Sequence, residues 1–226
     1  IVTSPFTARN LIAEFGVVAP RISVVEPGTD EAPVARGALP GQAPNLLCVA
    51  TLTPRKGHAL LIEALAGLKD RPWQLHCAGS LVMDPACSAA VRQAIATHGL
   101  EQRVVLHGEQ DEAGLSLLYA AADAFVLPSY HEGYGMALAE AIAHGLPVIS
   151  TRAGAIADTV PAAAGVLVPP GDAQALRAAL ARLLDNDAWR LHLRSGALQA
   201  RATLSTWRRS SERFSDALAA LREQEP

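Results

Sequence analysis

Residues 124–144 read AFVLPSYHEGYGMALAEAIAH, and they predict a strand, a turn and a helix in direct succession. The apolar run before Pro128 is typical of a short buried strand, which the proline ends. Gly133 and Gly135 allow the backbone to turn tightly into a helix that we expect to run to about His144. Backbone amides at the start of such a helix lack intrahelical partners and therefore attract an anion.

This segment carries two carboxylates, Glu132 in the turn and Glu140 in the helix. Glu140 is the single acidic residue from Met136 to Ala143, so we expect a mostly buried helix whose one carboxylate faces a polar cleft. Taken alone, Glu132 is better explained as an exposed loop acid, and Glu140 as a charge that favours an early helical turn. Their shared place after a strand favours a ligand site. A short hydrolase-type separation does not follow from the sequence, and recognition of hydroxyl groups is the simpler role.

A second candidate cluster is TLTPRKG at 51–57, between a predicted strand and a predicted helix. Arg55 and Lys56 would oppose the positive end of the helix dipole unless an anion lies there, and a diphosphate would suit them. A solvated basic turn explains the cluster equally well. His107 ends another predicted strand and could offer backbone contacts to a nucleobase, or simply begin a turn.

Composition restricts the class of protein. The chain has 226 residues, 50% of them hydrophobic, and a formal charge of −3, so it can build a core and offers no basic footprint for nucleic acid. We expect no metal site, because the three cysteines lack a metal-ligand spacing and indicate a reducing compartment. The chain contains no run of 18 apolar residues and begins with Ile1, so we expect that a segment precedes it.

Strand and helix patterns alternate after residue 45, which predicts an α/β fold with a doubly wound parallel sheet. The predicted strands are 46–50, 73–78, 104–107, 124–127, 147–150 and 165–168, and the main predicted helices are 57–69, 85–98, 111–122, 155–160 and 172–184. Asp172 is a plausible cap of the last helix.

The predicted organisation has four parts. Residues 1–28, with a short helix and a strand-like run at 22–25, belong to an inter-domain region, and 29–45 are a linker rich in proline, alanine and glycine. Residues 46–203 form the Rossmann-like domain. The final part, 204–226, is a helix whose apolar stripe of Trp207, Phe214, Leu218 and Leu221 needs a partner surface.

Six ordered segments together resemble the carboxyl-terminal, donor-binding half of retaining family 4 glycosyltransferases. They are Val24–Asp30, Val49–Gly57, Val104–Gly108, Ala122–Ser129, Glu132–Glu140 and Gly145–Ser150. The two glutamates eight positions apart are the most specific part of this resemblance. The family implies the Rossmann-like carboxyl-terminal domain of a two-domain GT-B enzyme, which transfers an α-linked hexosyl unit from a nucleoside-diphosphate sugar to a hydroxyl acceptor in glycan biosynthesis.

The resemblance also implies roles for individual residues. Glu132 would contact hydroxyls of the donor sugar, Glu140 the ribose, and Lys56 the diphosphate, with Glu132 and Lys56 the catalytic pair. The amides around Gly133, Tyr134, Gly135 and Met136 would hold the phosphate end, with Arg55 and His107 completing the donor site. No cofactor is implied beyond the donor substrate.

The family implies an amino-terminal acceptor-binding domain, so this chain alone is expected to be inactive. We expect a cytoplasmic protein, with attachment to the inner face of a membrane left open for the missing part. Many relatives have a glycine and an arginine where this chain has Ala50 and Thr51, so part of the phosphate clamp is either absent or supplied by Arg55. The alternative function is a non-catalytic nucleotide-sugar-binding module; an epimerase fits the two-glutamate turn less well.

Overall fold

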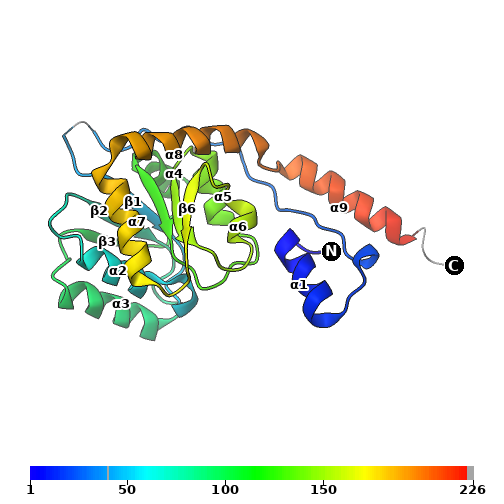
Figure 1. Ribbon diagram of the computed structural model, residues 1–226, viewed down its shortest axis with the longest axis horizontal. Coiled ribbons are helices and arrows are strands. Elements are labelled where there is room, and N and C mark those ends of the chain that lie inside the picture. Colours follow the sequence, from blue (N-terminus) through cyan, green and yellow to red (C-terminus); the bar gives the residue numbers. More distant parts are fainter. Residues whose placement is uncertain (40, 223–226) are drawn as a thin grey trace.

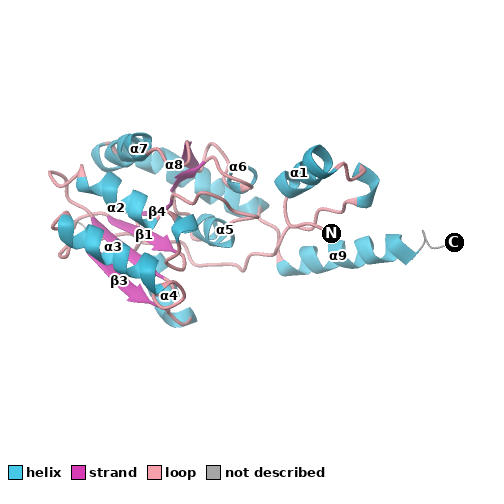
Figure 2. Cartoon of the chain, turned by 90° about the horizontal axis from the view of Figure 1, so that it is seen from below, coloured by secondary structure: helices cyan, strands magenta, loops and turns pink. Residues whose placement is uncertain are grey.

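The computed structural model describes residues 1–39 and 41–222, with Leu221 and Arg222 described by their backbone alone. Within these residues a six-stranded, all-parallel sheet has the order β3-β2-β1-β4-β5-β6 (Figures 1 and 2). Its strands are β1 Asn45–Val49, β2 Gln74–Ala78, β3 Val104–Gly108, β4 Ala124–Leu127, β5 Val148–Thr151 and β6 Gly165–Val168. This order reverses direction between β1 and β4, and it confirms the predicted doubly wound fold.

Helices cover both faces of the sheet. The helix α2 lies between α3 and α7 on one face, whereas α4 and α5 pack against the other, and α8 crosses to contact α5, α7 and β6. Their bounds are α1 Pro5–Phe15, α2 His58–Ala66, α3 Pro85–Thr97, α4 Glu112–Ala121, α5 Met136–Ala143, α6 Ile156–Thr159, α7 Ala173–Asp185, α8 Asp187–Ala200 and α9 Trp207–Arg222. Short 3₁₀ turns occupy Ala19–Arg21, Pro54–Lys56 and Arg201–Thr203.

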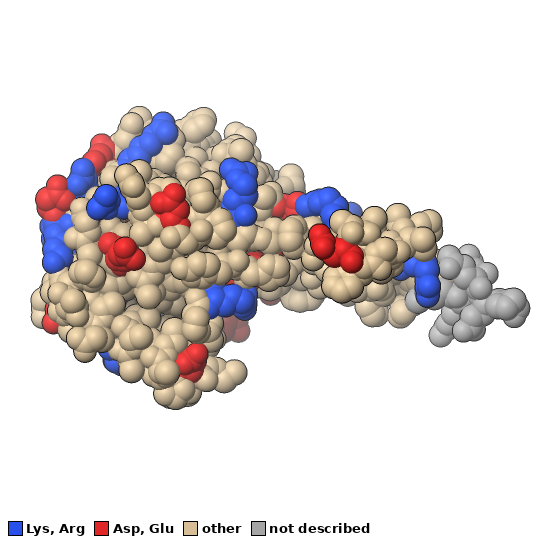
Figure 3. Space-filling view, turned by 60° about the horizontal axis from the view of Figure 1, so that its bottom comes forward, with Lys and Arg blue, Asp and Glu red and all other residues tan. Residues whose placement is uncertain are grey.

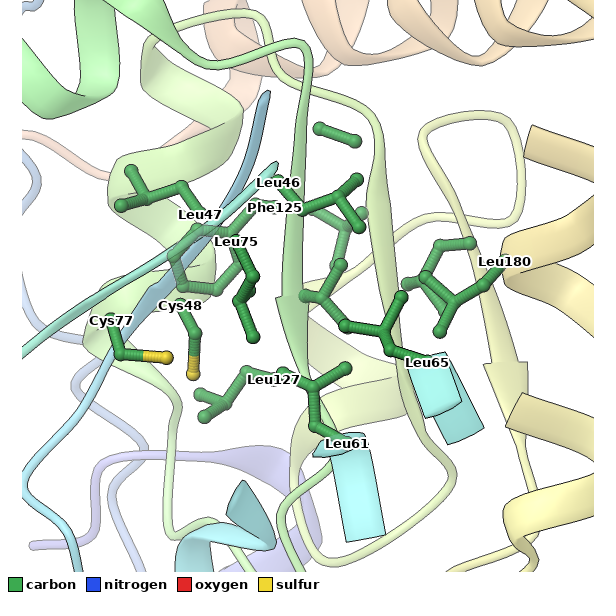
Figure 4. Packing of buried hydrophobic residues seen from close by; sticks show 14 of the residues in the cluster. Leu46, Leu47, Cys48, Leu61, Leu65, Leu75, Cys77, Phe125, Leu127 and Leu180 are labelled. Carbon is green, nitrogen blue, oxygen red and sulfur yellow. The ribbon is translucent and has the colours of Figure 1, made fainter. Parts of the chain in front are cut away.

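The core lies where the central strands meet these helices (Figure 4). Side chains of β1 and β4 are buried without exception from Leu46 to Cys48 and from Ala124 to Leu127, as expected of strands covered on both faces. Helix starts follow the predicted chemistry: the Asp172 carboxylate accepts a hydrogen bond from the Ala175 amide at 2.8 Å and caps α7.

The helices α1 and α9 lie on the same side of the domain, outside the sheet (Figure 1). The Thr29 amide donates to the Ser205 carbonyl at 2.7 Å, and the Thr206 hydroxyl caps α9. Trp207, Phe214 and Leu218 remain 44–50% exposed, so the predicted apolar stripe is largely open to solvent on this chain. The side chain of Leu221 and residues 223–226 lie outside the described residues.

Several sequence predictions need correction. The run at 22–25 forms only an isolated bridge between Val2 and Val24. Trp73 precedes β2, and its indole donates to the Leu68 carbonyl at 2.8 Å. The helix α2 ends at Ala66, three residues early, where Gly67 caps it. The prediction placed no element between 185 and 203, but α8 lies there, and its buried residues are mostly small.

Gly57, in a left-handed conformation, allows the loop before α2 to approach the loop after β4 closely. An added Cβ at Gly57, whose φ is +73°, would lie 2.2 Å from the Pro128 carbonyl oxygen, whereas at Gly99, with φ +61°, it would meet no atom of the described residues within 4 Å. Both alanine variants carry the backbone strain of a left-handed residue, about 1–2 kcal/mol. We expect Gly57→Ala to lower the free energy of unfolding in urea by at least about 1 kcal/mol more than Gly99→Ala. Equal losses would show that the approach of the two loops is not close.

Candidate functional site

Two turns meet at the carboxyl ends of β1 and β4, where the strand order reverses. The first turn contains Arg55 and Lys56 and leads into α2, and the second runs from Pro128 to Gly135 and leads into α5. The Tyr130 amide donates to the Arg55 carbonyl at 2.7 Å, which joins the turns through their backbones. Ligands bind in this position in doubly wound sheets.

Glu132 is the centre of the site. One carboxylate oxygen accepts from Lys56 Nζ at 2.6 Å and from the Ser129 hydroxyl at 2.7 Å, and the other lies 3.3 Å from Arg55 Nη1. The Glu132 side chain is 7% exposed and that of Lys56 18%. The structure therefore excludes two alternatives that the sequence left open. Glu132 is not an exposed loop acid, and Lys56 is not a solvated cation.

Backbone contacts from a third segment hold Glu132 in place. Its carbonyl accepts from the Ala155 amide at 2.8 Å, and the left-handed Gly154 brings the chain so close that a Cβ would lie 2.2 Å from this oxygen. The Thr151 hydroxyl donates to the Ser129 carbonyl and secures the start of the turn. The loop is thus anchored to the end of β5 as well as to the Arg55 turn.

The helix α5 begins beside this carboxylate. Gly135, with φ +96°, precedes Met136, and no side chain of the described residues caps the helix. Gly133 is exposed and is absent from the described glycines with positive φ, so Gly135 alone makes the left-handed turn that both were predicted to support. A cavity of about 430 Å³ opens here, lined by Lys56, Glu132, Tyr134, Gly135 and Met136, among others. It offers an anion both a cation and free amides.

Glu140 faces a second, adjoining cavity of about 320 Å³, which shares Met136 with the first. Its carboxylate accepts a hydrogen bond from the Tyr119 hydroxyl at 3.1 Å, and both residues line this cavity. Burial and the neighbouring Glu140 carboxylate raise the pKa of Tyr119 well above its ordinary value, so the phenol stays a donor. The polar cleft expected at Glu140 is present, and the helix α5 contributes residues to both cavities.

His107 lies apart from these groups. It belongs to β3, at the far edge of the sheet, and its ring nitrogen is 3.0 Å from that of His76 on β2. Among the described residues that line the two cavities, His107 does not occur. Burial lowers the pKa of His107, and burial together with His107 lowers that of His76. The nucleobase role of His107 stays a prediction.

Sequence reasoning missed two participating side chains. Ser129 precedes Glu132 by three residues, a spacing at which a hydroxyl can bond a side chain across a turn, and this signal was available. Tyr119 comes from α4, and only the packing of α4 beside α5 brings it to Glu140. The sequence carries no local mark of that contact.

The surface agrees with the charge balance. On the face shown in Figure 3, basic and acidic side chains are interspersed instead of gathering into a patch of one sign. Among the described helices, none combines the length and the apolar character needed to cross a bilayer.

Fold and site together define a Rossmann-like α/β domain with a polar cleft at its topological switch point. The family model described as "Glycosyl transferases group 1" matches residues 43–186. The chain belongs to this family, and its fold is that of the carboxyl-terminal half of a GT-B glycosyltransferase.

Individual relatives agree with this assignment. The chain is 31% identical to the D-inositol 3-phosphate glycosyltransferase of Streptosporangium roseum, over 97% of this chain and 54% of that protein. Sucrose-phosphate synthase from Thermosynechococcus elongatus is 30% identical and superposes with a TM-score of 0.85, over 99% of this chain and 58% of that one. Anabaena HepE in complex with UDP and glucose is 22% identical, with a TM-score of 0.83 over 97% of this chain and 62% of that one, a likeness of fold. The chain spans about half the length of the curated relatives that it matches.

The environment of Glu132 predicts a pH dependence of stability. Burial raises its pKa, but hydrogen bonds from Lys56 and Ser129 and the two cations outweigh burial, so the net shift is downward from 4.5. A depressed pKa stabilises the folded state above the unfolded value, and this contribution is lost as the pH falls. We expect Glu132→Gln to reduce the free energy of unfolding most at neutral pH, with the difference shrinking below about pH 4.5.

Urea unfolding of both proteins across this range checks the prediction. Glu101→Gln, at an exposed position, is the matched control and should differ little from the original chain at any pH. A constant Glu132→Gln deficit across the range would mean that the ion pair does not contribute to folding.

Proposed function

We propose that this chain is the donor-binding half of a retaining glycosyltransferase, which moves a hexosyl unit from a nucleoside-diphosphate sugar to a hydroxyl acceptor. The observation that carries the proposal is the pair of adjoining cavities along α5. One holds Lys56 and Glu132 beside an open helix start, and the other holds Glu140 and Tyr119. A nucleoside-diphosphate sugar has matching chemistry, with an anionic centre between two groups rich in hydroxyls.

The diphosphate fits the first cavity. The amides at the start of α5 and the Lys56 ammonium both favour negative charge, and the half-exposed Arg55 adds a second cation beside Glu132. When the bond between the anomeric carbon and the diphosphate breaks, negative charge grows on the leaving oxygen. Groups already in place to stabilise that charge lower the barrier.

Glu132 would then act on the sugar. Its carboxylate is held by Lys56, Arg55 and Ser129, so it is a fixed hydrogen-bond acceptor beside the phosphate cavity and suits sugar hydroxyls. In the retaining course that we propose, the acceptor hydroxyl attacks on the face from which the diphosphate leaves and transfers its proton to the leaving oxygen. This route needs no protein nucleophile.

Glu140 would receive the ribose. Its carboxylate lies in the second cavity, which adjoins the first at Met136. In a nucleoside-diphosphate sugar, the diphosphate likewise lies between the sugar and the ribose, so a ligand whose diphosphate is in the first cavity would extend its ribose into the second. HepE was solved with UDP and with UDP-glucose, which makes uridine diphosphate the first nucleotide to test. The nucleobase itself is best identified with a thermal-shift panel of uridine, guanosine and adenosine diphosphate sugars.

The proposal requires a partner domain. Catalysis needs donor and acceptor held together, and we infer that an amino-terminal domain supplies the acceptor, so that this chain alone binds donor without turnover. The curated relatives support this inference, because the region that matches this chain is only about half of their length. A non-catalytic binding module is the second candidate, because Ala50 and Thr51 stand where the resemblance to the family implies a glycine and an arginine of the phosphate clamp.

Replacing Lys56 tests the diphosphate site. Lys56→Ala should weaken binding of uridine diphosphate by about 1.5–3 kcal/mol, the usual worth of a charge-assisted hydrogen bond, and leave weak binding of uridine nearly unchanged. Arg55 still faces Glu132 in this variant, so the buried carboxylate keeps a cation. Titration calorimetry of both ligands measures the difference.

The chain offers a matched control in its other lysine, the exposed Lys69, because Lys69→Ala removes the same charge far from the cleft. The assignment fails if Lys56→Ala and Lys69→Ala bind the diphosphate equally well. Glycosylation of a hydroxyl acceptor by the isolated 226-residue chain would contradict the need for a partner domain.

A further inference from the structure

Three potential metal ligands meet below the Lys56 turn. Cys48 and Cys77 are register partners on the adjacent parallel strands β1 and β2, and His58 is the first residue of α2. One ligand atom from each residue lies within 4.8 Å of the others. Figure 4 shows the two sulfur atoms close together beside Leu127. The residues are far apart in sequence, which is why cysteine spacing gave no sign of them.

The environment of His58 is unusual for a core residue. Its imidazole is 2% exposed, Nε2 lies 3.6 Å from Cys48 Sγ, and Nδ1 has no hydrogen-bond partner among the described residues. A buried imidazole that makes only a long contact to sulfur lacks the hydrogen bonds that normally offset its burial. An ion bound at Nε2 would replace this long contact to sulfur with a ligand bond.

We propose that Cys48, Cys77 and His58 bind one Cu⁺ ion. Thiolate sulfur is a soft ligand that selects copper(I) or zinc, and imidazole nitrogen suits copper as well. On binding, each thiol loses its proton, so two protons are released and the ion joins two thiolates and a neutral imidazole. Two sulfurs at about 2.3 Å from one ion lie at most about 4.6 Å apart, and the ligand atoms of the cluster all lie within 4.8 Å of one another.

The donor set favours Cu⁺ over Zn²⁺. Structural zinc is almost always four-coordinate, but within the described residues no fourth histidine, cysteine or carboxylate joins the group, and its three members are at most 2% exposed. Copper(I) is stable with three ligands. The bound centre carries one net negative charge, which the amino-terminal end of α2 and Lys56, two residues before His58, help to offset.

The fold also provides a route to this buried cluster. His58 lines a groove of about 550 Å³ between α2 and α3, together with Arg55, Cys87 and Tyr130. We infer that the ion enters the cluster from this groove. Cys87, only partly buried on α3, also lines the groove and is the natural control.

Competition with a chromophoric copper(I) chelator tests the proposal on the reduced 226-residue chain under anaerobic conditions. We expect one Cu⁺ per chain, and the same stoichiometry in Cys87→Ser. Cys48→Ala, Cys77→Ala and His58→Leu should each bind at least 10- to 100-fold more weakly, since even loss of an outer-shell partner costs this much. Circular dichroism shows whether each variant is folded.

A second measurement does not depend on variants. X-ray absorption at the copper edge of the loaded, unaltered chain should give two sulfurs and one nitrogen at bonding distance. The proposal is overturned if the chain retains no more Cu⁺ than Cys48→Ala, if Cys87→Ser abolishes retention, or if Zn²⁺ displaces Cu⁺ from the cluster.

Discussion

The buried carboxylate of Glu132 is the feature on which the arrangement of the cleft depends. The Glu132 side chain is only 7% exposed, so its negative charge has lost most of its hydration. Interactions with Lys56, Arg55 and Ser129 replace that hydration. These partners come from two turns that follow different strands, so satisfying one carboxylate fixes the relative position of both turns. The cleft is therefore assembled before any ligand enters, which is the condition for effective electrostatic stabilisation of a developing charge.

Topology and backbone chemistry make this assembly possible. The order in which strands are added to the sheet changes direction between β1 and β4. This places the two turns side by side at the carboxyl ends of these strands. Gly57 and Gly154 then allow approaches to Pro128 and Glu132 that a side chain would block. Packing also brings the His58 imidazole into the core beside Cys48. There its Nδ1 atom has no hydrogen-bond partner among the described residues. The proposed copper site rests on the meeting of the His58 imidazole with the thiols of Cys48 and Cys77 in this core.

Local patterns were sufficient to predict the fold, whereas the roles of the candidate residues follow from the resemblance to the family and stay predictions. Alternating strands and helices, proline and glycine at the turns, and the isolated Glu140 in an apolar helix all act over a few positions, and the structure follows them closely. Contacts between distant segments were not predictable in this way. Examples are the ion pair of Lys56 with Glu132, the Tyr119 hydroxyl on Glu140, and the meeting of Cys48, His58 and Cys77. The helix α8 was missed because its buried face is formed largely by small residues.

The central claim is that one nucleoside-diphosphate sugar spans the two cavities along α5. A crystal structure of the chain with UDP-glucose tests it most directly. The account predicts the diphosphate between Lys56 and the amides at the start of α5, the sugar hydroxyls at Glu132, and the ribose at Glu140. It is contradicted if the diphosphate lies away from Lys56, or if the nucleotide occupies the far edge of the sheet near His107 and leaves Glu140 without a contact.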